Sequence, residues 1–168
     1  MTVEGQLPSW KFKLTVLQNY RSVYQMSAAL LGDAAEAEDV TQETFTRYWQ
    51  DGASVNEPKH WLMRVARNGC IDRLRRSSRI QYRDDQDLPV VHDDCDAALE
   101  LESEEQQAAL RKAIASLPEP QRSIVIFFGL RGMSGAECAQ ILNLSTNQVK
   151  VYLHRARQRL SRIMEENA

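Results

Sequence analysis

Residues that interrupt helices are scarce in this sequence, which has seven Gly and five Pro among 168 residues. Sustained alternation of apolar and polar residues, the mark of a half-buried strand, is missing as well. Both absences argue against a sheet and predict an all-α fold. The chain is long enough for one ordinary domain or two small ones.

Cysteines are few and far apart. Cys70, Cys95 and Cys138 include no Cys-x-x-Cys pair, which excludes a disulfide framework and predicts reduced thiols in a cytosolic protein. No apolar run approaches the length of a membrane span, and residues 1–8 lack the basic and apolar regions of a signal peptide. We therefore expect a cytoplasmic protein that does not insert into a membrane.

Catalytic motifs are missing too. His60, His92 and His154 have no Ser or Cys placed beside them by a nucleophile motif, and there is no Gly-rich phosphate loop. We predict that the chain is not an enzyme and has no catalytic residue, bound metal or cofactor. A metal or redox sensor built from His92, Cys95 and one of the other two cysteines is an alternative, but the spacing is unlike that of a ligand set.

Basic residues are absent from one long acidic segment. From Asp84 to Glu105 there are ten acids and no Lys or Arg, whereas the other 146 residues hold 21 bases and 13 acids, a net charge of +8. The formal net charge of −2 for the whole chain therefore conceals a strong segregation of charge. The acidic balance is no argument against a nucleic-acid partner.

The acidic segment also divides the chain. It contains Pro89 and begins where the helical periodicity lapses. We predict a flexible linker at 84–103 between a first domain at 1–83 and a second domain at 104–168. A new helix is expected to start near Ala97.

Three helices are predicted before the linker. The first ends at Gly32, a usual C-terminal stop. Asp33 caps the second, which continues to about Gln50, and the third begins after Pro58 and runs past Arg76. The apolar sides are expected to hold Ala37, Val40, Phe45, Tyr48 and Trp49 on the second helix, and Leu62, Val65 and Ala66 on the third.

Two capping boxes mark a pair of short helices in the second domain. Ser134 with Glu137, and Ser145 with Gln148, match the pattern in which a Ser and a Glu or Gln three residues on satisfy each other's backbone donors. Asn143 stands where the chain must bend, and Asn tolerates the left-handed backbone conformation. The sequence predicts two helices joined by a tight corner.

The second of these helices is strongly cationic. It carries Lys150, His154, Arg155, Arg157, Arg159 and Arg162. No acid lies between Glu137 and Glu165, which favours a helix-turn-helix with this helix in the major groove over an ordinary hairpin with a solvated basic face. We expect Val149, Leu153 and Leu160 to face inward, and Asn147, Gln148, Lys150 and Val151 to lie near the exposed N-terminal turn.

The third predicted helix of the first domain also has a cationic face. At helical spacing this face holds Asn68, Asp72, Arg75, Arg76 and Arg79. Two cationic helices in separate domains are harder to explain by chance than one. Trp61, beside Leu62, is interpreted as a core residue rather than a base-stacking wedge.

Four segments carry a family resemblance. They read AEDVTQETF at 37–45 followed by Trp49, WLMRVARN and IDRLRR within 61–76, LPEPQR at 117–122, and VKVYLHRARQRL at 149–160. The first resembles the core-binding segment of bacterial sigma factors, and the second resembles the promoter-melting helix of the extracytoplasmic-function (ECF) group. The last two are similar to the second domain of that group. Together they cover about 20–79 and 110–164, in the right order.

The resemblance implies a factor that binds core RNA polymerase, directs it to promoter DNA and helps to open the duplex. It assigns polymerase binding to Asp39, Gln42 and Glu43, whose charge-assisted acceptors suit a basic partner. A solvated helix side is the plain alternative, and a divalent metal held by Glu36, Asp39 and Glu43 is a weaker one. The neighbouring motifs favour polymerase.

The resemblance also implies that the two domains recognise two promoter elements. Contacts to the −10 element fall to Asn56, Arg64, Asn68, Asp72, Arg75, Arg76 and Arg79. An unstacked base needs a pocket, which the loop at 52–59 would supply with Asn56 as its polar reader. Contacts to the −35 element fall to Ser145, Thr146, Asn147, Gln148, Lys150, Val151, His154, Arg155 and Arg157.

The sequence departs from the family pattern at several positions. Gly69 and Cys70 replace the usual aliphatic residues, and a Gly within a helix costs about 1 kcal/mol relative to Ala. Tyr152 occupies a place often held by Arg, so one contact to DNA is in doubt. The base preference of relatives cannot be transferred to this chain.

Two other classes of function stay open from the sequence. A self-sufficient helix-turn-helix regulator would bind promoter duplex without core enzyme, usually as a dimer on a palindrome. A protein-interaction adaptor would leave both basic faces merely solvated. The acidic segment and the first basic helix favour a sigma factor, for which the family implies an anti-sigma factor as a further partner.

Overall fold

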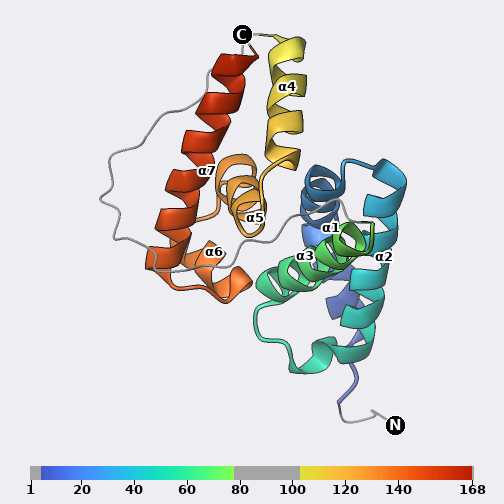
Figure 1. The fold of residues 1–168 in the computed structure, drawn as a ribbon. Coiled ribbons are helices and arrows are strands. Elements are labelled where there is room, and N and C mark those ends of the chain that lie inside the picture. Colours follow the sequence, from blue (N-terminus) through green and yellow to red (C-terminus); the bar gives the residue numbers. More distant parts are fainter. Residues whose placement is uncertain (1–4, 78–102, 168) are drawn as a thin grey trace. The chain divides into compact units, whose positions relative to one another are not determined.

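The structure, a computed structural model, describes residues 5–77 and 103–167, and its regular elements are helices (Figure 1). They are α1 (Ser9–Leu31), α2 (Ala34–Asp51), the short 3₁₀ helix η1 (Gly52–Ser54), α3 (Pro58–Arg76), α4 (Glu104–Ala115), α5 (Gln121–Val125), the π-helical turn η2 (Ile126–Leu130), α6 (Gly135–Leu142) and α7 (Thr146–Glu166). The prediction of an all-α fold is confirmed. Within the described ranges, no helix is both long and apolar enough to cross a membrane.

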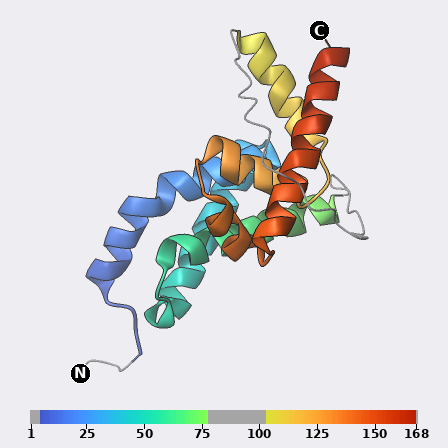
Figure 2. The same cartoon turned by 90° about the vertical axis from the view of Figure 1, so that its left-hand side faces the viewer.

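The helices form two compact units, residues 1–77 and residues 78–168. In the first unit α1, α2 and α3 pack against one another, and Figure 2 shows the same three helices from the side. In the second unit α7 packs against α4, α5 and α6. The predicted linker at 84–103 lies outside the described residues except for Ser103, which caps α4.

The ends of α1 and α2 are set by local chemistry, as predicted. Gly32 ends α1 in the left-handed conformation with φ 67°, where a Cβ would be strained. The Asp33 carboxylate then accepts a hydrogen bond from the backbone N–H of Glu36, which satisfies a free donor at the start of α2.

Tyr48 lies at the centre of the first unit. Its side chain is fully buried, and its ring contacts Phe12 of α1 and Trp61 of α3 with ring centroids 6.2 and 5.7 Å apart. Trp49, predicted on the same apolar side, is instead 38% exposed and packs edge-to-face on Phe12. A tryptophan at the edge of this core keeps one side in contact with water.

Helix α3 differs in two details from the prediction. It includes Pro58 as its first residue, where the missing N–H costs nothing, and it ends at Arg76 rather than running past it. Leu62 and Ala66 are buried as expected, but Val65 is only half-buried. The interior side of α3 also includes Met63, Cys70, Ile71 and Leu74, so it is turned away from Val65.

Gly69 gives a first testable prediction about stability. A Cβ built there would meet the Val40 side chain at 3.5 Å, an ordinary contact, and the position is helical. Gly69→Ala should therefore raise the free energy of unfolding of the first unit by about 0.5–1 kcal/mol, measured by urea denaturation. Gly52→Ala is the matched contrast, because its Cβ would lie 2.6 Å from the Tyr48 ring and should lower stability. Equal effects of the two substitutions would contradict this account.

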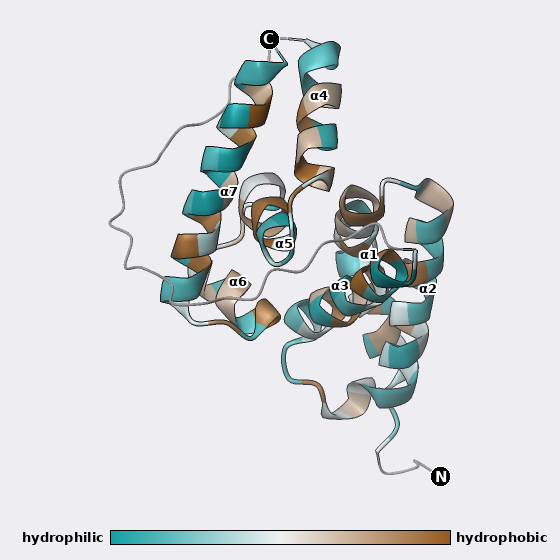
Figure 3. Ribbon diagram, in the orientation of Figure 1, coloured by the Kyte–Doolittle hydropathy of each residue, from teal (hydrophilic) through white to brown (hydrophobic). Residues whose placement is uncertain are grey.

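The second unit begins with a capped helix. The Ser103 hydroxyl accepts a hydrogen bond from the N–H of Gln106, so α4 starts at Glu104. The helix start predicted near Ala97 falls outside the described residues. Along α4 and α7 apolar and polar stretches alternate (Figure 3), as expected of helices that bury one side.

The LPEPQR segment builds the interior of the second unit. The Glu119 carboxylate is buried and accepts hydrogen bonds from the backbone N–H and the hydroxyl of Ser123, at 3.2 and 2.6 Å. Arg122 is also buried, and its guanidinium donates to the carbonyl of Ala115 at the end of α4. Arg122 thereby joins α5 to the end of α4, while Glu119 is held by the first turn of α5, because buried charges require such partners.

Candidate functional site

An acidic surface on α2 brings together three residues predicted from the sequence. Asp39, Gln42 and Glu43 are exposed and line an open hollow together with Thr46 and Arg47. Their spacing of three, four, seven and eight residues puts all five on one side of the helix. We call this surface, defined by these five residues, the α2 hollow.

Neighbouring helices hold the α2 hollow in place. Gln42 donates to the Glu38 carboxylate at 3.1 Å, and the Tyr20 hydroxyl of α1 donates to the same carboxylate. That hydrogen bond is the largest cause that raises the pKa of Tyr20 to about 12. On the other side, Arg73 of α3 forms an ion pair with Glu43 at 2.8 Å.

The sequence alternative of a metal bound beside the hollow finds no support in the geometry. Within residues 5–77 and 103–167, no three His, Cys, Asp or Glu side chains are arranged to hold a metal ion. Glu43 is already paired with Arg73. Asp39 presents its carboxylate to a basic partner, while Glu43 is shared with Arg73 and the cation of Arg47 lies in the same hollow.

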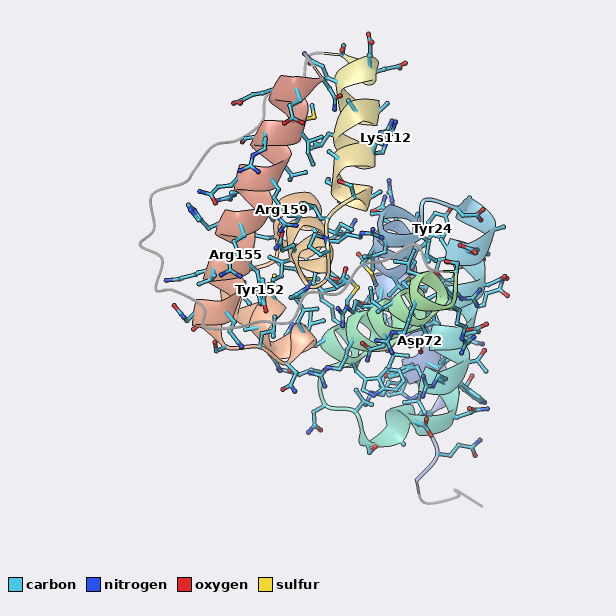
Figure 4. All side chains as sticks on the ribbon, in the orientation of Figure 1. Tyr24, Asp72, Lys112, Tyr152, Arg155 and Arg159 are labelled. Atoms are coloured by element: carbon cyan, nitrogen blue, oxygen red, sulfur yellow. The ribbon has the colours of Figure 1, made fainter. Side chains whose placement is uncertain are left out.

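Helix α3 presents the predicted cationic face. Its exposed members are Arg64, Asn68, Asp72, Arg75 and Arg76. Steps of three or four residues put them along one side of the helix, where Figure 4 labels Asp72. The amide oxygen of Asn68 accepts from Arg67 at 3.4 Å. Arg79 was predicted on the same face and lies outside the described residues.

The connection before α3 is shorter than predicted. Residues 52–54 form η1 and α3 starts at Pro58, so only residues 55–57 of the predicted loop at 52–59 are non-helical. Gly52 is buried and lets the backbone approach the Tyr48 ring, which anchors the connection to the core. Asn56 is exposed in its middle. Trp61, predicted as a core residue, is only half-buried and packs against Tyr48 with ring centroids 5.7 Å apart.

The helix-turn-helix geometry matches the sequence prediction. Both capping boxes are present: Ser134 and Glu137 satisfy each other's backbone donors at 3.1 and 3.0 Å, and Ser145 and Gln148 do so at 3.0 and 2.8 Å. Asn143 ends α6 in the left-handed conformation with φ 55° and ψ 46°. Three residues, 143–145, therefore join α6 to α7.

The cationic helix α7 has two different sides. Thr146, Asn147 and Lys150 are exposed at its start, while the side chains of His154, Arg155 and Arg157 are half-buried. Successive residues are 100° apart around a helix, so Arg155 and Arg157 lie about 160° apart, on opposite sides. Arg155 and Arg159, both labelled in Figure 4, are four residues and so only about 40° apart around the helix.

Comparison with known proteins agrees with this arrangement. Residues 15–80 match the family described as Sigma-70 region 2, and residues 107–160 match Sigma-70, region 4. The ECF RNA polymerase sigma factor SigL of Mycobacterium tuberculosis is 34% identical over 164 residues, covering 87% of this chain and 89% of SigL. SigW of Bacillus subtilis, another ECF sigma factor, is 29% identical over 161 residues, covering 86% of this chain and 83% of SigW.

The chain belongs to the ECF group of RNA polymerase sigma factors. Its function is to direct transcription initiation at promoters. A solved structure of the sigma factor RpoE with the anti-sigma factor NepR from Bartonella quintana has the same fold, with a TM-score of 0.67 and 22% identity over 92% of this chain and 96% of that one.

One of the residues predicted to contact DNA is not on the surface of the sigma factor. Val151 was expected near the exposed N-terminal turn of α7 but is fully buried. An aliphatic side chain gains free energy by leaving water, whereas neighbouring Lys150 keeps its charge exposed. Val149 and Leu160 are buried as predicted, and Leu153 is half-buried.

Tyr152 also has an interior role in the sigma factor. It is 2% exposed, so the side chain that replaces the family's frequent Arg packs into the protein. Its place along α7 is labelled in Figure 4. Its ring is therefore not on the surface of α7 that could meet DNA.

Two contacts of the predicted site residues, one in each unit, were missed by reasoning from the sequence. Arg73 neutralises part of the α2 hollow, and Phe128 lies 5.5 Å from the guanidinium of Arg157 as a cation–π partner. Both contacts depend on which elements meet in space, so neither left a signal in the sequence. The cap formed by Ser145 and Gln148, by contrast, was predicted and is present.

The thiols of the sigma factor are poor candidates for a sensor. Burial raises the pKa of Cys70 to about 12 and that of Cys138 to about 11. At neutral pH both therefore stay protonated, and the protonated thiol is a weak nucleophile and metal ligand. His92 and Cys95, the other members of that alternative, lie outside the described residues.

Proposed function

We propose that this sigma factor grips core RNA polymerase through the α2 hollow, recognises the −10 element with α3 and recognises the −35 element with α7. We assign residues 1–83 to polymerase binding and recognition of the −10 element, residues 84–103 to a linker, and residues 104–168 to recognition of the −35 element. The observation that carries the proposal is the acidic hollow and the cationic face on adjacent helices of one unit.

The α2 hollow suits a basic helix or loop of the polymerase. Asp39 is exposed, and no other described side chain is paired with it in the structure, so its carboxylate is open to an incoming cation. Gln42 and Glu43 are held in position by Glu38 and Arg73, which lowers the entropy lost on binding. Charge complementarity of this kind also accelerates association.

The α3 face suits a strand of DNA as it separates from its partner. Arg64, Arg75 and Arg76 provide cations for phosphates, while Asn68 and Asp72 carry the hydrogen-bonding groups that base edges need. We assign Asn56, which is exposed in the short connection, to a base that has left the stack. The plain alternative is that Arg75 and Arg76 only stabilise the C-terminal end of α3.

The start of α7 suits the major groove of the −35 element. Thr146, Asn147 and Lys150 project at the end that reaches base edges in a helix-turn-helix. Arg155 and Arg157 lie on opposite sides of the helix and fit phosphates on the two strands that border the groove. Ser145 and Gln148 form the cap at the start of α7. We assign them to DNA only through their remaining hydrogen-bond donors.

The proposal also covers the enzymatic activity, the cellular location and the regulation of the sigma factor. It acts as an initiation factor without enzymatic activity of its own, in the cytoplasm where polymerase and promoter DNA are present. We also propose an anti-sigma factor as a regulatory partner, since the similarly folded RpoE was solved bound to one. Filter binding to promoter DNA with and without core enzyme tests the central assignment, because a self-sufficient regulator would bind equally well in both cases.

Recognition of bases should depend on the start of α7. Lys150→Ala should relax preference at one or two positions of the −35 element by about 1–3 kcal/mol if a bidentate contact is lost. Arg157→Ala should weaken all sequences almost equally and lower the log–log salt slope of binding by about one. Binding to a library of single-base promoter variants measures both effects.

Gln148 needs a variant that separates its two roles. Gln148→Glu keeps a carboxyl oxygen as the acceptor for the Ser145 N–H but removes the amide donors, so it should change base preference while preserving the cap. Gln148→Ala removes both the acceptor for the cap and the amide donors, so it should also lower helix stability. If Arg157→Ala altered base preference while Gln148→Glu and Lys150→Ala did not, the assigned orientation of α7 in the groove would be wrong.

A further inference from the structure

Helix α1 carries an apolar seam on the side that faces away from its own core. Trp10, Leu14 and Leu17 are 68%, 46% and 83% exposed, which is unusual for three large apolar side chains on one helix. Nothing in the proposed polymerase and DNA contacts uses them. We call Trp10, Leu14, Leu17 and Arg21 the α1 seam.

The spacing of the α1 seam is that of a coiled coil. Its four members follow one another at intervals of four, three and four residues, and Tyr24, labelled in Figure 4, continues the pattern three residues later. Alternating steps of three and four keep side chains facing a second helix along their whole length. The buried residues of α1, such as Val23 and Met26, lie on the opposite side of the helix.

The charge of α1 selects the kind of helix that fits. Among its 23 residues are Lys11, Lys13 and Arg21 and no acid. Lys13 and Arg21 are exposed beside or within the seam. A partner helix with acids at the flanking positions would neutralise them, as flanking charges do in coiled coils.

The same charges disfavour two other occupants. Two copies of α1 would bring six cations together without an acid to compensate, so self-association is opposed. A membrane surface requires a broad apolar side opposite the charges, but here Arg21 stands in line with the leucines. The seam is also narrow, because its members span only about 60° around the helix.

We infer that the α1 seam is a docking surface for an acidic amphipathic helix of a partner protein, apolar at heptad spacing and distinct from core polymerase. The inference stands apart from the proposed roles of α2, α3 and α7, because none of the four seam residues belongs to them. Trp10 and Leu17 would bury the most surface and supply most of the binding energy.

The test uses the full-length protein and two synthetic 21-residue helical peptides. Both have Leu at heptad positions and Ala and Gln elsewhere; one has Glu and the other Lys at the flanking positions. We expect the Glu peptide to bind at least tenfold more tightly than the Lys peptide in fluorescence anisotropy. Leu17→Glu should weaken the Glu peptide at least tenfold, and Ala35→Glu, which adds the same charge at an exposed position on α2 outside the seam, should weaken it much less.

Parallel measurements decide between the occupants. Circular dichroism should show unchanged helicity for Leu17→Glu, since that side chain is exposed, and co-purification with core polymerase should be retained. Equal binding of both peptides, or equal loss with Ala35→Glu, would overturn the inference. So would a dimer in sedimentation that Leu17→Glu dissociates, pelleting with phosphatidylserine vesicles that it abolishes, or loss of core polymerase binding.

Discussion

Asp39→Arg should abolish co-purification of the sigma factor with core RNA polymerase while leaving its helicity unchanged. The carboxylate is exposed in the α2 hollow, so its replacement removes an acceptor and places a cation against the basic partner. Like charges brought together at an interface cost several kcal/mol, which corresponds to a loss of about a thousandfold in affinity. Pull-down with purified core enzyme, quantified by titration, measures the change.

The structure also shows which variants make good companions for Asp39→Arg. Glu43→Arg would face Arg73 and disturb the contact between α2 and α3, so it confounds folding with binding. Asp51→Arg makes the same change of charge at an exposed position about 120° round the helix from Asp39 and should leave polymerase binding intact. Retained co-purification by Asp39→Arg, or equal loss by Asp51→Arg, would overturn the assignment of the α2 hollow.

Replacing Arg75 and Arg76 by Ala should impair promoter opening far more than capture of the −35 element. Both cations lie at the exposed end of the α3 face, and each lost phosphate contact should lower the log–log salt slope of the open complex by about one. Permanganate footprinting of unpaired thymines measures opening, and protection of the −35 element measures capture. The effect should grow if Arg79, on the same predicted face, is replaced as well.

A purely structural role of these arginines has a distinct signature. Cations in the last turn stabilise a helix by about 0.3–1 kcal/mol each, so the double Ala variant should also unfold at a slightly lower urea concentration. Replacing both by Lys keeps the charge at the helix end but loses the planar fork, and it should restore stability more fully than opening. Lys59→Ala, at the other end of α3, is a control for the loss of a surface cation. If the variant with both Arg75→Ala and Arg76→Ala opened the promoter normally, these arginines would have no role in melting.

Features decided by a few neighbouring residues could be predicted from the sequence. Gly32, Asp33 and Asn143 end or begin helices because their own backbone and side-chain chemistry suits those positions. Both capping boxes belong to the same class. The order of helices, and the side of α2 that is acidic, follow from periodicity in the same direct way.

Features decided by contact between helices could not be predicted from the sequence. Val151 and Lys150 are neighbours in a polar stretch, and only packing in three dimensions buries the first and exposes the second. The ion pair of Glu43 with Arg73 joins residues 30 positions apart, for which the sequence offers no register. Trp49 likewise fits the apolar pattern of α2, yet it lies at the rim of the core, where Phe12 covers only one side.

Transcription in vitro with purified core RNA polymerase tests the central claim most directly. Core enzyme alone should give no discrete starts on a library of genomic fragments from the source organism. With the sigma factor added, we predict discrete start sites that share sequence elements near −10 and −35, and we predict that Asp39→Arg removes them while Asp51→Arg does not. Unchanged transcription on addition of the protein, together with tight binding to promoter duplex in the absence of core enzyme, would contradict the account.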